Sequence, residues 1–251
     1  MIVAGHELEV AWYGNETASA PIVLLHEGLG SVSHWREFPR ELAARTGRRV
    51  LAYSRFGYGQ SDILDAPRSV DYMHVEAEAV LPALLAALGI ERPVLFGHSD
   101  GASIALIFAG RYPQACAALA LEAPHVFVEP QTVASIAQMK DVARKTDLLA
   151  KMAPHHRDPA RTFWGWNDVW LAPAFRNWNI TDRLASITAP ALILQGKDDE
   201  YGSAAQVDAI AARVGRVESL FIDACGHSPH RSAPEMVLDA TARFLAALPQ
   251  A

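Results

Sequence analysis

Three kinds of residue that can together perform nucleophilic catalysis occur in this chain in a defined order. Ser99 lies at the centre of the sequence G-H-S-D-G, an aspartate pair follows at Asp198 and Asp199, and His227 comes after them. A serine hydroxyl becomes a good nucleophile at neutral pH only when an imidazole takes its proton. That imidazole needs a carboxylate to hold its tautomer. The set therefore predicts acyl transfer through a covalent intermediate on Ser99.

The residues around Ser99 predict a sharp turn between a strand and a helix. The apolar run at 94–96 has the composition of a buried strand, and small and apolar residues continue after Gly101 at helical spacing. So tight a turn crowds its neighbours, and glycine is therefore favoured two residues before and two after its centre, as at Gly97 and Gly101. A five-residue pattern of this kind also arises by chance, so its weight comes from the strand and the helix that flank it.

The rest of the chain alternates between apolar runs and amphipathic segments, which indicates a parallel sheet covered by helices. Strands are expected at 2–12, 21–25, 48–53, 94–96, 117–121, 191–195 and 217–222, and helices at 33–46, 70–88, 100–111, from 203, and 232–248. Pro82 is expected to kink or interrupt its helix because proline removes a backbone hydrogen bond. The serine, the aspartate pair and the histidine each follow a predicted strand, at the edge where open parallel sheets place their sites.

With this strand, turn and helix around Ser99, and with serine, acid and histidine in that order, the chain resembles the α/β-hydrolase superfamily. The resemblance is to serine carboxylesterase and enol-lactonase-like members. It implies an α/β fold with a mostly parallel central sheet of about eight strands flanked by helices. The core would comprise residues 1–124 and 184–251. Residues 125–183, where the alternation stops, would form a helical lid insertion.

The resemblance also bears on which carboxylate would hold the histidine. Asp199 stands three residues after Gly196, as in the G-x-x-D loops of the superfamily, and is preferred to Asp198 for that reason. Glu122, at the end of an earlier predicted strand, stays open as a third candidate because some members take their acid from that position. Each of the three could equally be a solvated loop carboxylate.

Two histidines on one loop are candidates for the base. His227 is preferred to His230 because Gly226 allows a turn directly after the last predicted strand. His98 is not a candidate, since it precedes Ser99 directly and is expected to point away from it and pack behind the turn.

The loop after the strand at 21–25 is expected to help hold an oxyanion. In the superfamily a loop containing H-G supplies one backbone donor here, and the residue after the nucleophile, here Asp100, supplies the other. This chain has His26 followed by Glu27, so the first donor is left open between Gly28 and Leu29. His26 is expected to brace the loop by hydrogen bonds, while Glu27 is either a surface carboxylate or part of the substrate pocket.

The segment 125–183 contains four of the six tryptophans of the chain. Trp164 and Trp166 are the favoured pocket contacts, because Gly165 between them is expected to let the backbone turn and aim the rings differently. A metal site at His155 and His156 is disfavoured, because adjacent residues on a helix or strand point in different directions.

Composition excludes several other classes of protein. The 251 residues are 51% apolar and 20% charged, which is ordinary for one globular enzyme domain. The net charge of -6 gives no basic surface for nucleic acid or an anionic membrane. Cys116 and Cys225 are expected to be free thiols. With no leader-like N-terminus and no apolar span of about 18 residues, a cytoplasmic protein is expected.

The leading hypothesis is a serine hydrolase that cleaves a small carboxylic ester or lactone, with no metal or organic cofactor implied. Carbon–carbon bond hydrolases and hydroxynitrile lyases use the same three residues, so the reaction class stays open. A non-catalytic ligand-binding protein on a hydrolase fold is a further alternative. The expected partner is the small-molecule substrate, with neither nucleic acid nor membrane, and association into a homo-oligomer is left open.

Overall fold

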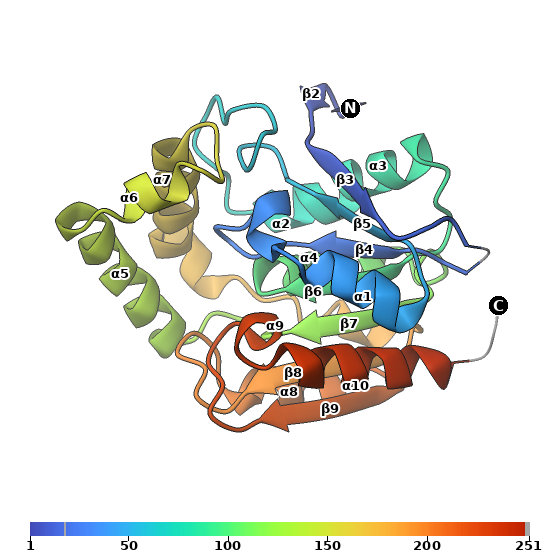
Figure 1. The fold of residues 1–251 in the computed structure, drawn as a ribbon. Coiled ribbons are helices and arrows are strands. Elements are labelled where there is room, and N and C mark those ends of the chain that lie inside the picture. Colours follow the sequence, from blue (N-terminus) through green and yellow to red (C-terminus); the bar gives the residue numbers. More distant parts are fainter. Residues whose placement is uncertain (18, 249–251) are drawn as a thin grey trace.

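The structure, a computed structural model, describes residues 1–17 and 19–248, and a seven-stranded sheet lies at its centre (Figure 1). The strand order is β3-β5-β4-β6-β7-β8-β9. Only β3 and β5 pair antiparallel, and all other neighbours are parallel. The strands are β3 (Val10–Tyr13), β4 (Ile22–Leu25), β5 (Val50–Tyr53), β6 (Val94–His98), β7 (Ala118–Glu122), β8 (Ala191–Gly196) and β9 (Val217–Ile222). The α/β fold with a mostly parallel sheet is confirmed.

The strand count differs slightly from the expected eight because the N-terminal residues pair with themselves. β1 (Ile2–Val3) and β2 (His6–Glu7) form a separate antiparallel pair. Ala4 and Gly5 make the turn between them, both at positive φ. The expected strand at 2–12 is therefore split, and only its second part joins the main sheet in the described residues.

Helices cover both faces of the sheet, and alternate strand residues supply the two cores. Leu24 and Phe96 face one core, with Phe38 and Phe244 from the helices, whereas Leu95 faces the other. The first face carries η1 (Val32–Trp35), α1 (Phe38–Thr46), α9 (Pro229–Ser232) and α10 (Pro234–Ala246). Figure 1 shows α1 and α10 side by side in front of the sheet. The second face carries α2 (Tyr72–Val75), α3 (Leu81–Ala87), α4 (Asp100–Arg111) and α8 (Ala204–Ala211).

Pro82 interrupts its helix as expected. Between α2 and α3 the chain makes one π-helical turn, η2 (Glu76–Val80). Proline has no backbone N–H to donate to the carbonyl four residues earlier, that of Glu78. The hydroxyl of Tyr112 donates to this carbonyl oxygen instead, at 2.9 Å. The π-helical turn thus accommodates Pro82, and the carbonyl of Glu78 keeps a hydrogen-bond partner.

Between β7 and β8 the chain forms a helical insertion. Its elements are α5 (Pro130–Lys145), α6 (Leu148–Met152), α7 (Pro159–Leu171), η3 (Pro173–Asn177) and η4 (Leu184–Ser186). In Figure 1, α5, α6 and α7 lie beyond the end of the sheet toward which the β7 arrow points. They therefore stand over the carboxyl ends of the parallel strands. Among the described residues no helix has both the length and the apolar character needed to span a membrane.

Candidate active site

Ser99 occupies a strained turn between β6 and α4. Its φ is +53°, a value that L-residues rarely adopt. A Cβ on Gly97 would collide with the backbone of Gly101 and Ala102, and one on Gly101 would collide with the carbonyl of Leu25 in β4. The two glycines are therefore required by close backbone approach, and the turn presents the Ser99 side chain at the carboxyl edge of the sheet.

The structure brings Ser99, His227 and Asp199 into one hydrogen-bonded chain. His227 Nε2 lies 2.9 Å from Ser99 Oγ, and His227 Nδ1 lies 2.9 Å and 3.0 Å from the two oxygens of Asp199. A carboxylate only accepts, so Nδ1 carries a proton and donates to Asp199. Nε2 of the neutral ring is then free to accept the serine proton.

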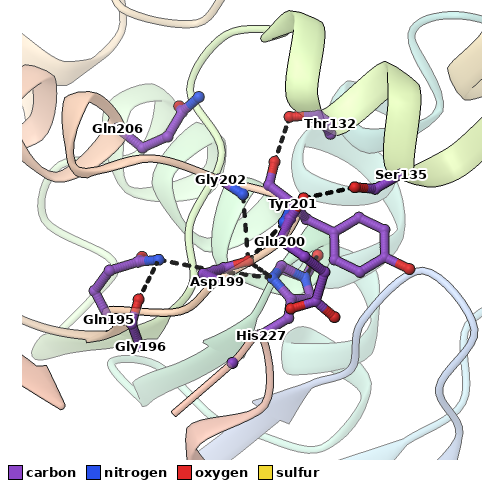
Figure 2. Close-up of polar contacts among 12 residues, drawn as sticks. Thr132, Ser135, Gln195, Gly196, Asp199, Glu200, Tyr201, Gly202, Gln206 and His227 are labelled. Atoms are coloured by element: carbon purple, nitrogen blue, oxygen red, sulfur yellow. Dashed lines mark hydrogen bonds and ion pairs between the residues drawn. The ribbon is translucent and has the colours of Figure 1, made fainter. Parts of the chain in front are cut away.

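Asp199 is held by the loop that follows β8 (Figure 2). Its Oδ1 accepts from the amides of Tyr201 at 2.8 Å and Gly202 at 3.2 Å, and its Oδ2 accepts from Gln195 Nε2 at 2.8 Å. Burial acts to raise the pKa of Asp199, but the hydrogen bonds from His227 and the backbone outweigh it and hold the pKa at about 2. The carboxylate is therefore ionised at neutral pH.

The rival acid and the rival base contact each other rather than Ser99. His230 Nδ1 lies 2.6 Å from Glu122 Oε2, and both side chains are buried. Asp198 is exposed, and its side chain makes no hydrogen bond to any residue of 1–17 or 19–248. Of the alternatives open at the level of sequence, only Asp199 contacts His227.

The loop after β4 is braced as expected. His26 Nε2 accepts from the backbone N–H of Arg55 at 3.1 Å, so its Nδ1 carries the proton and donates to the carbonyl of Glu27 at 2.7 Å. Burial lowers the pKa of His26, which favours this neutral form. Gly28, Leu29 and Asp100 then line one cavity with Ser99. Asp100 begins α4, so its N–H has no acceptor within the helix.

A cavity of about 260 Å³ opens onto Ser99 and His227. Its far wall comes from the insertion, with Thr132 and Ile136 of α5 and Trp166 and Trp170 of α7. Glu27 lines it too, so this carboxylate belongs to the pocket wall and not to the outer surface.

The insertion is hydrogen-bonded to the loop that carries Asp199. Thr132 donates to the carbonyl of Tyr201, and Ser135 donates to the carbonyl of Glu200 at 2.6 Å (Figure 2).

Trp164 does not line this cavity, contrary to expectation. It lines a neighbouring cavity of about 400 Å³ with Leu64 and Arg68. Gly165 does not turn the backbone, because it lies within α7. Residues two apart on a helix point about 200° apart, so Trp164 and Trp166 face opposite sides.

His125 is a pocket residue that the sequence did not reveal. It lies between β7 and α5, its ring is buried, and its centroid is 5.6 Å from that of His227. Burial, with His227 nearby, lowers its pKa to about 3, so the ring is neutral. Neither ring nitrogen has a hydrogen-bond partner within the described part of the chain. Its place just after a strand was the available signal, but nothing in the sequence showed which way the ring points.

Three buried residues behind Ser99 carry atoms that could coordinate a metal ion. His98, Glu122 and His230 each place one ligand atom within 4.8 Å of the others. Two of their nitrogens are already hydrogen-bonded, His230 Nδ1 to Glu122 and His98 Nε2 to the carbonyl of His227 at 2.7 Å. A metal would have to displace those protons, so the geometry is that of a hydrogen-bonded cluster.

Comparison with known proteins agrees with this architecture. A family model described as alpha/beta hydrolase fold matches residues 21–164. The chain is 26% identical over 265 residues to a proline iminopeptidase of Lactobacillus helveticus, covering 89% of this chain and 88% of that protein. The solved proline iminopeptidase of Mycobacterium smegmatis has a TM-score of 0.75 at 23% identity, covering 98% of this chain and 96% of that one. The enol-lactonase of Burkholderia xenovorans LB400 has a TM-score of 0.75 at 20% identity, covering 97% and 98%.

The matched family model spans more than half of the chain, so the protein belongs to the α/β-hydrolase-fold family. The fold and the names of its relatives make it a hydrolase. The two solved structures are less than 25% identical to the chain and bear on the fold alone.

Proposed function

We propose that the protein is a serine hydrolase that cleaves a small carboxylic ester or lactone through an acyl-enzyme on Ser99. One observation carries the proposal: the continuous path of hydrogen bonds from Ser99 through His227 to Asp199, each about 2.9 Å long, at the mouth of a cavity. This is the geometry that general-base activation of a serine requires.

In the proposed reaction Ser99 Oγ attacks the substrate carbonyl while its proton passes to His227 Nε2. The carbonyl oxygen becomes an oxyanion, which the amide of Asp100 and that of Gly28 or Leu29 stabilise by hydrogen bonds. His227 then gives its proton to the leaving alkoxide, and the acyl group remains on Ser99. Water attacks the acyl-enzyme with His227 again as base, which releases the acid and restores the serine.

The cavity size supports a compact acyl group. About 260 Å³ is at the small end of ligand pockets, and rigid indoles from Trp166 and Trp170 form part of its wall. We infer that the insertion, residues 125–183, acts as a lid over Ser99. Short-chain or aromatic acyl groups would fit beneath it, and longer chains would meet α7.

Labelling with a fluorophosphonate, followed by mapping of the modified residue, tests the nucleophile. The proposal expects stoichiometric labelling on Ser99. A panel of p-nitrophenyl acetate, butyrate, octanoate and benzoate, with a five-membered lactone, then tests the substrate class. Turnover of none of them by a protein that does label on Ser99 would remove the ester and lactone assignment.

A second candidate is cleavage of an N-terminal amino acid from a peptide. The relatives named proline iminopeptidase match 89% of the chain. Besides Glu27, the cavity wall includes Glu200, whose carboxylate would favour a substrate with a free ammonium group. Prolyl p-nitroanilide beside N-acetylprolyl p-nitroanilide separates this candidate from the ester hydrolase, because only the first carries the cation.

A further inference from the structure

His98 lies between two groups that can only accept hydrogen bonds. Its Nε2 is 2.7 Å from the backbone carbonyl oxygen of His227, and its Nδ1 is 3.6 Å from Glu27 Oε2. A carbonyl oxygen has no proton to donate, and neither has an ionised carboxylate. The 3.6 Å separation is an ion-pair distance, and Nδ1 has no hydrogen-bond partner within the described part of the chain. A neutral ring would leave the carboxylate without a countercharge on this side, so the position favours an imidazolium with a proton on each nitrogen.

Glu27 reaches His98 because the next turn leaves room for its carboxylate. The side chain folds back over Gly30, where any Cβ would collide with Glu27 Oε2. The backbone carbonyl of Glu27 is fixed separately, by Arg55 Nη2 at 3.0 Å and by the amide of Gly30 at 3.1 Å. The loop therefore leaves room for the Glu27 carboxylate beside His98.

The contacts of His98 join three segments that are far apart in sequence. Glu27 belongs to the oxyanion loop after β4, His98 ends β6 directly before Ser99, and His227 lies on the loop after β9. The ring of His98 is 1% exposed, so water does not compete strongly for its protons.

We propose that the ion pair of Glu27 and His98 positions the oxyanion loop and the His227 loop around Ser99. Both are positioning residues that act through other groups and need not contact the substrate. Only the effect on turnover rests on the proposed function, because the protonation of His98 can be measured without it.

The charged surroundings of His98 set the pH range over which the pair persists. Glu27 faces it from the oxyanion loop, Glu122 from β7, His227 and His230 from the base loop and α9, and His125 from the segment after β7. Burial acts to lower the pKa of His98, but Glu27 and then Glu122 outweigh it and raise the pKa to about 9. Burial acts to raise the pKa of Glu27, but the histidines around it, His98 first, hold it well below its usual value.

The directions of these two pKa shifts define the pH range in which the ion pair stabilises the fold. Because folding raises the pKa of His98, the charged ring stabilises the fold fully below the pKa of about 6.5 that it has in the unfolded chain. This stabilisation is lost as the pH rises through about 9. Because folding lowers the pKa of Glu27, its carboxylate stabilises the fold fully above its usual pKa of about 4.5. This stabilisation is lost as the pH falls further. The pair is thus intact at neutral pH. Above pH 9 the deprotonated Nδ1 faces the carboxylate as a second acceptor.

NMR titration of the histidine ring nitrogens tests the charge state directly on the unmodified protein, with the His98 signal assigned by its loss in His98→Gln. The proposal expects His98 to be an imidazolium at pH 7 and to titrate near pH 9. In Glu27→Gln it should titrate near or below neutrality, because a carboxamide can donate to the neutral ring. A ring that is already neutral at pH 7 in the unmodified protein would overturn the proposal.

Kinetics test the positioning role. Glu27→Ala should lower kcat about tenfold or more with little change in KM, and Glu27→Gln should recover most of that loss. The unmodified enzyme should lose kcat above about pH 9, whereas Glu27→Gln should lack this alkaline limb. Glu218→Gln, an exposed side chain on β9, serves as the control with an unchanged limb. Equal losses in the Ala and Gln variants, or an alkaline limb that persists in Glu27→Gln, would refute positioning by the pair. If no substrate is found, the titration still decides whether the ion pair exists.

Discussion

Replacing Asp199 by asparagine tests which ring nitrogen of His227 must carry the proton in the proposed mechanism. Oδ1 of Asp199 accepts from two fixed backbone amides, so the asparagine oxygen must take that place. The new NH₂ group then occupies the place of Oδ2, beside His227 Nδ1 and Gln195. The oxygen in the Oδ1 place is still 2.9 Å from His227 Nδ1, but the NH₂ donor 3.0 Å away competes with it and favours the tautomer with its proton on Nε2. In that tautomer Nε2 cannot accept the proton of Ser99.

The fold should tolerate this change. The oxygen Oε1 of Gln195 is buried without a hydrogen-bond partner, so a flip of the Gln195 amide lets it accept from the new NH₂. We expect kcat/KM of Asp199→Asn to fall roughly 10³- to 10⁴-fold, as for loss of the acid in Ser-His-Asp enzymes. At about 1.36 kcal/mol per tenfold this is ~4–5.5 kcal/mol of transition-state stabilisation. The melting temperature should drop by no more than about 5 °C, corresponding to ~1–2 kcal/mol for a domain of this size.

The assay is hydrolysis of p-nitrophenyl acetate at pH 7.5, with thermal unfolding followed by circular dichroism on the same samples. Asp198→Asn is the matched control, since it makes the same chemical change one residue away on an exposed side chain. Its kcat/KM should stay within about twofold of the unmodified enzyme. The reasoning is refuted if Asp199→Asn retains more than a tenth of the activity, or if Asp198→Asn or Glu122→Gln is equally impaired.

Three further outcomes are expected. Ser99→Ala should fold normally, lose at least about 10³-fold in kcat/KM and no longer react with a fluorophosphonate; activity near that of the unmodified enzyme would remove Ser99 from the chemistry. Trp166→Ala should extend the acyl-chain profile of p-nitrophenyl esters from short toward medium chains, whereas Trp164→Ala, on the opposite side of α7, should leave the profile unchanged. Gly28→Ala should impair turnover because the new methyl collides with the indole nitrogen of Trp166. Adding Trp166→Ala should therefore restore part of the lost activity, and strictly additive effects of the two substitutions would contradict the clash.

The parts of the site that could be predicted from the sequence are those that follow strand ends. Ser99, Asp199 and His227 each come after an apolar run, and parallel pairing places such ends along one edge. The order serine, acid, histidine along the chain then limits which residues can serve together as nucleophile, acid and base. The prediction for Trp164 is wrong for a local reason: glycine favours a turn at Gly165, but the chain continues there as one helix, α7.

The partnership of Glu27 and His98 had no signal in the sequence. The two are separated by 71 positions, and their contact depends on β4 and β6 being neighbours in register, with Leu25 opposite Gly97. Glu27 departs from the H-G pattern of the superfamily, but its position in the sequence does not show that its side chain folds back toward His98. A buried ion pair of this kind becomes visible only when burial, hydrogen-bond donors and hydrogen-bond acceptors are counted together in three dimensions.

The site consists of two kinds of element, which differ in how far their residues can be substituted without altering the proposed chemistry. The proposed nucleophile, base and acid lie on short loops whose positions follow from the parallel sheet, and a change in any of them should alter the proposed chemistry. The outer wall of the cavity comes from α5 and α7, which are not part of the sheet. Thr132 and Ser135 join α5 to the loop that carries Asp199, so the wall is nonetheless fixed relative to the reacting groups. Substitutions on the inner sides of α5 and α7 should therefore change which acyl group fits while leaving the path of the proton intact.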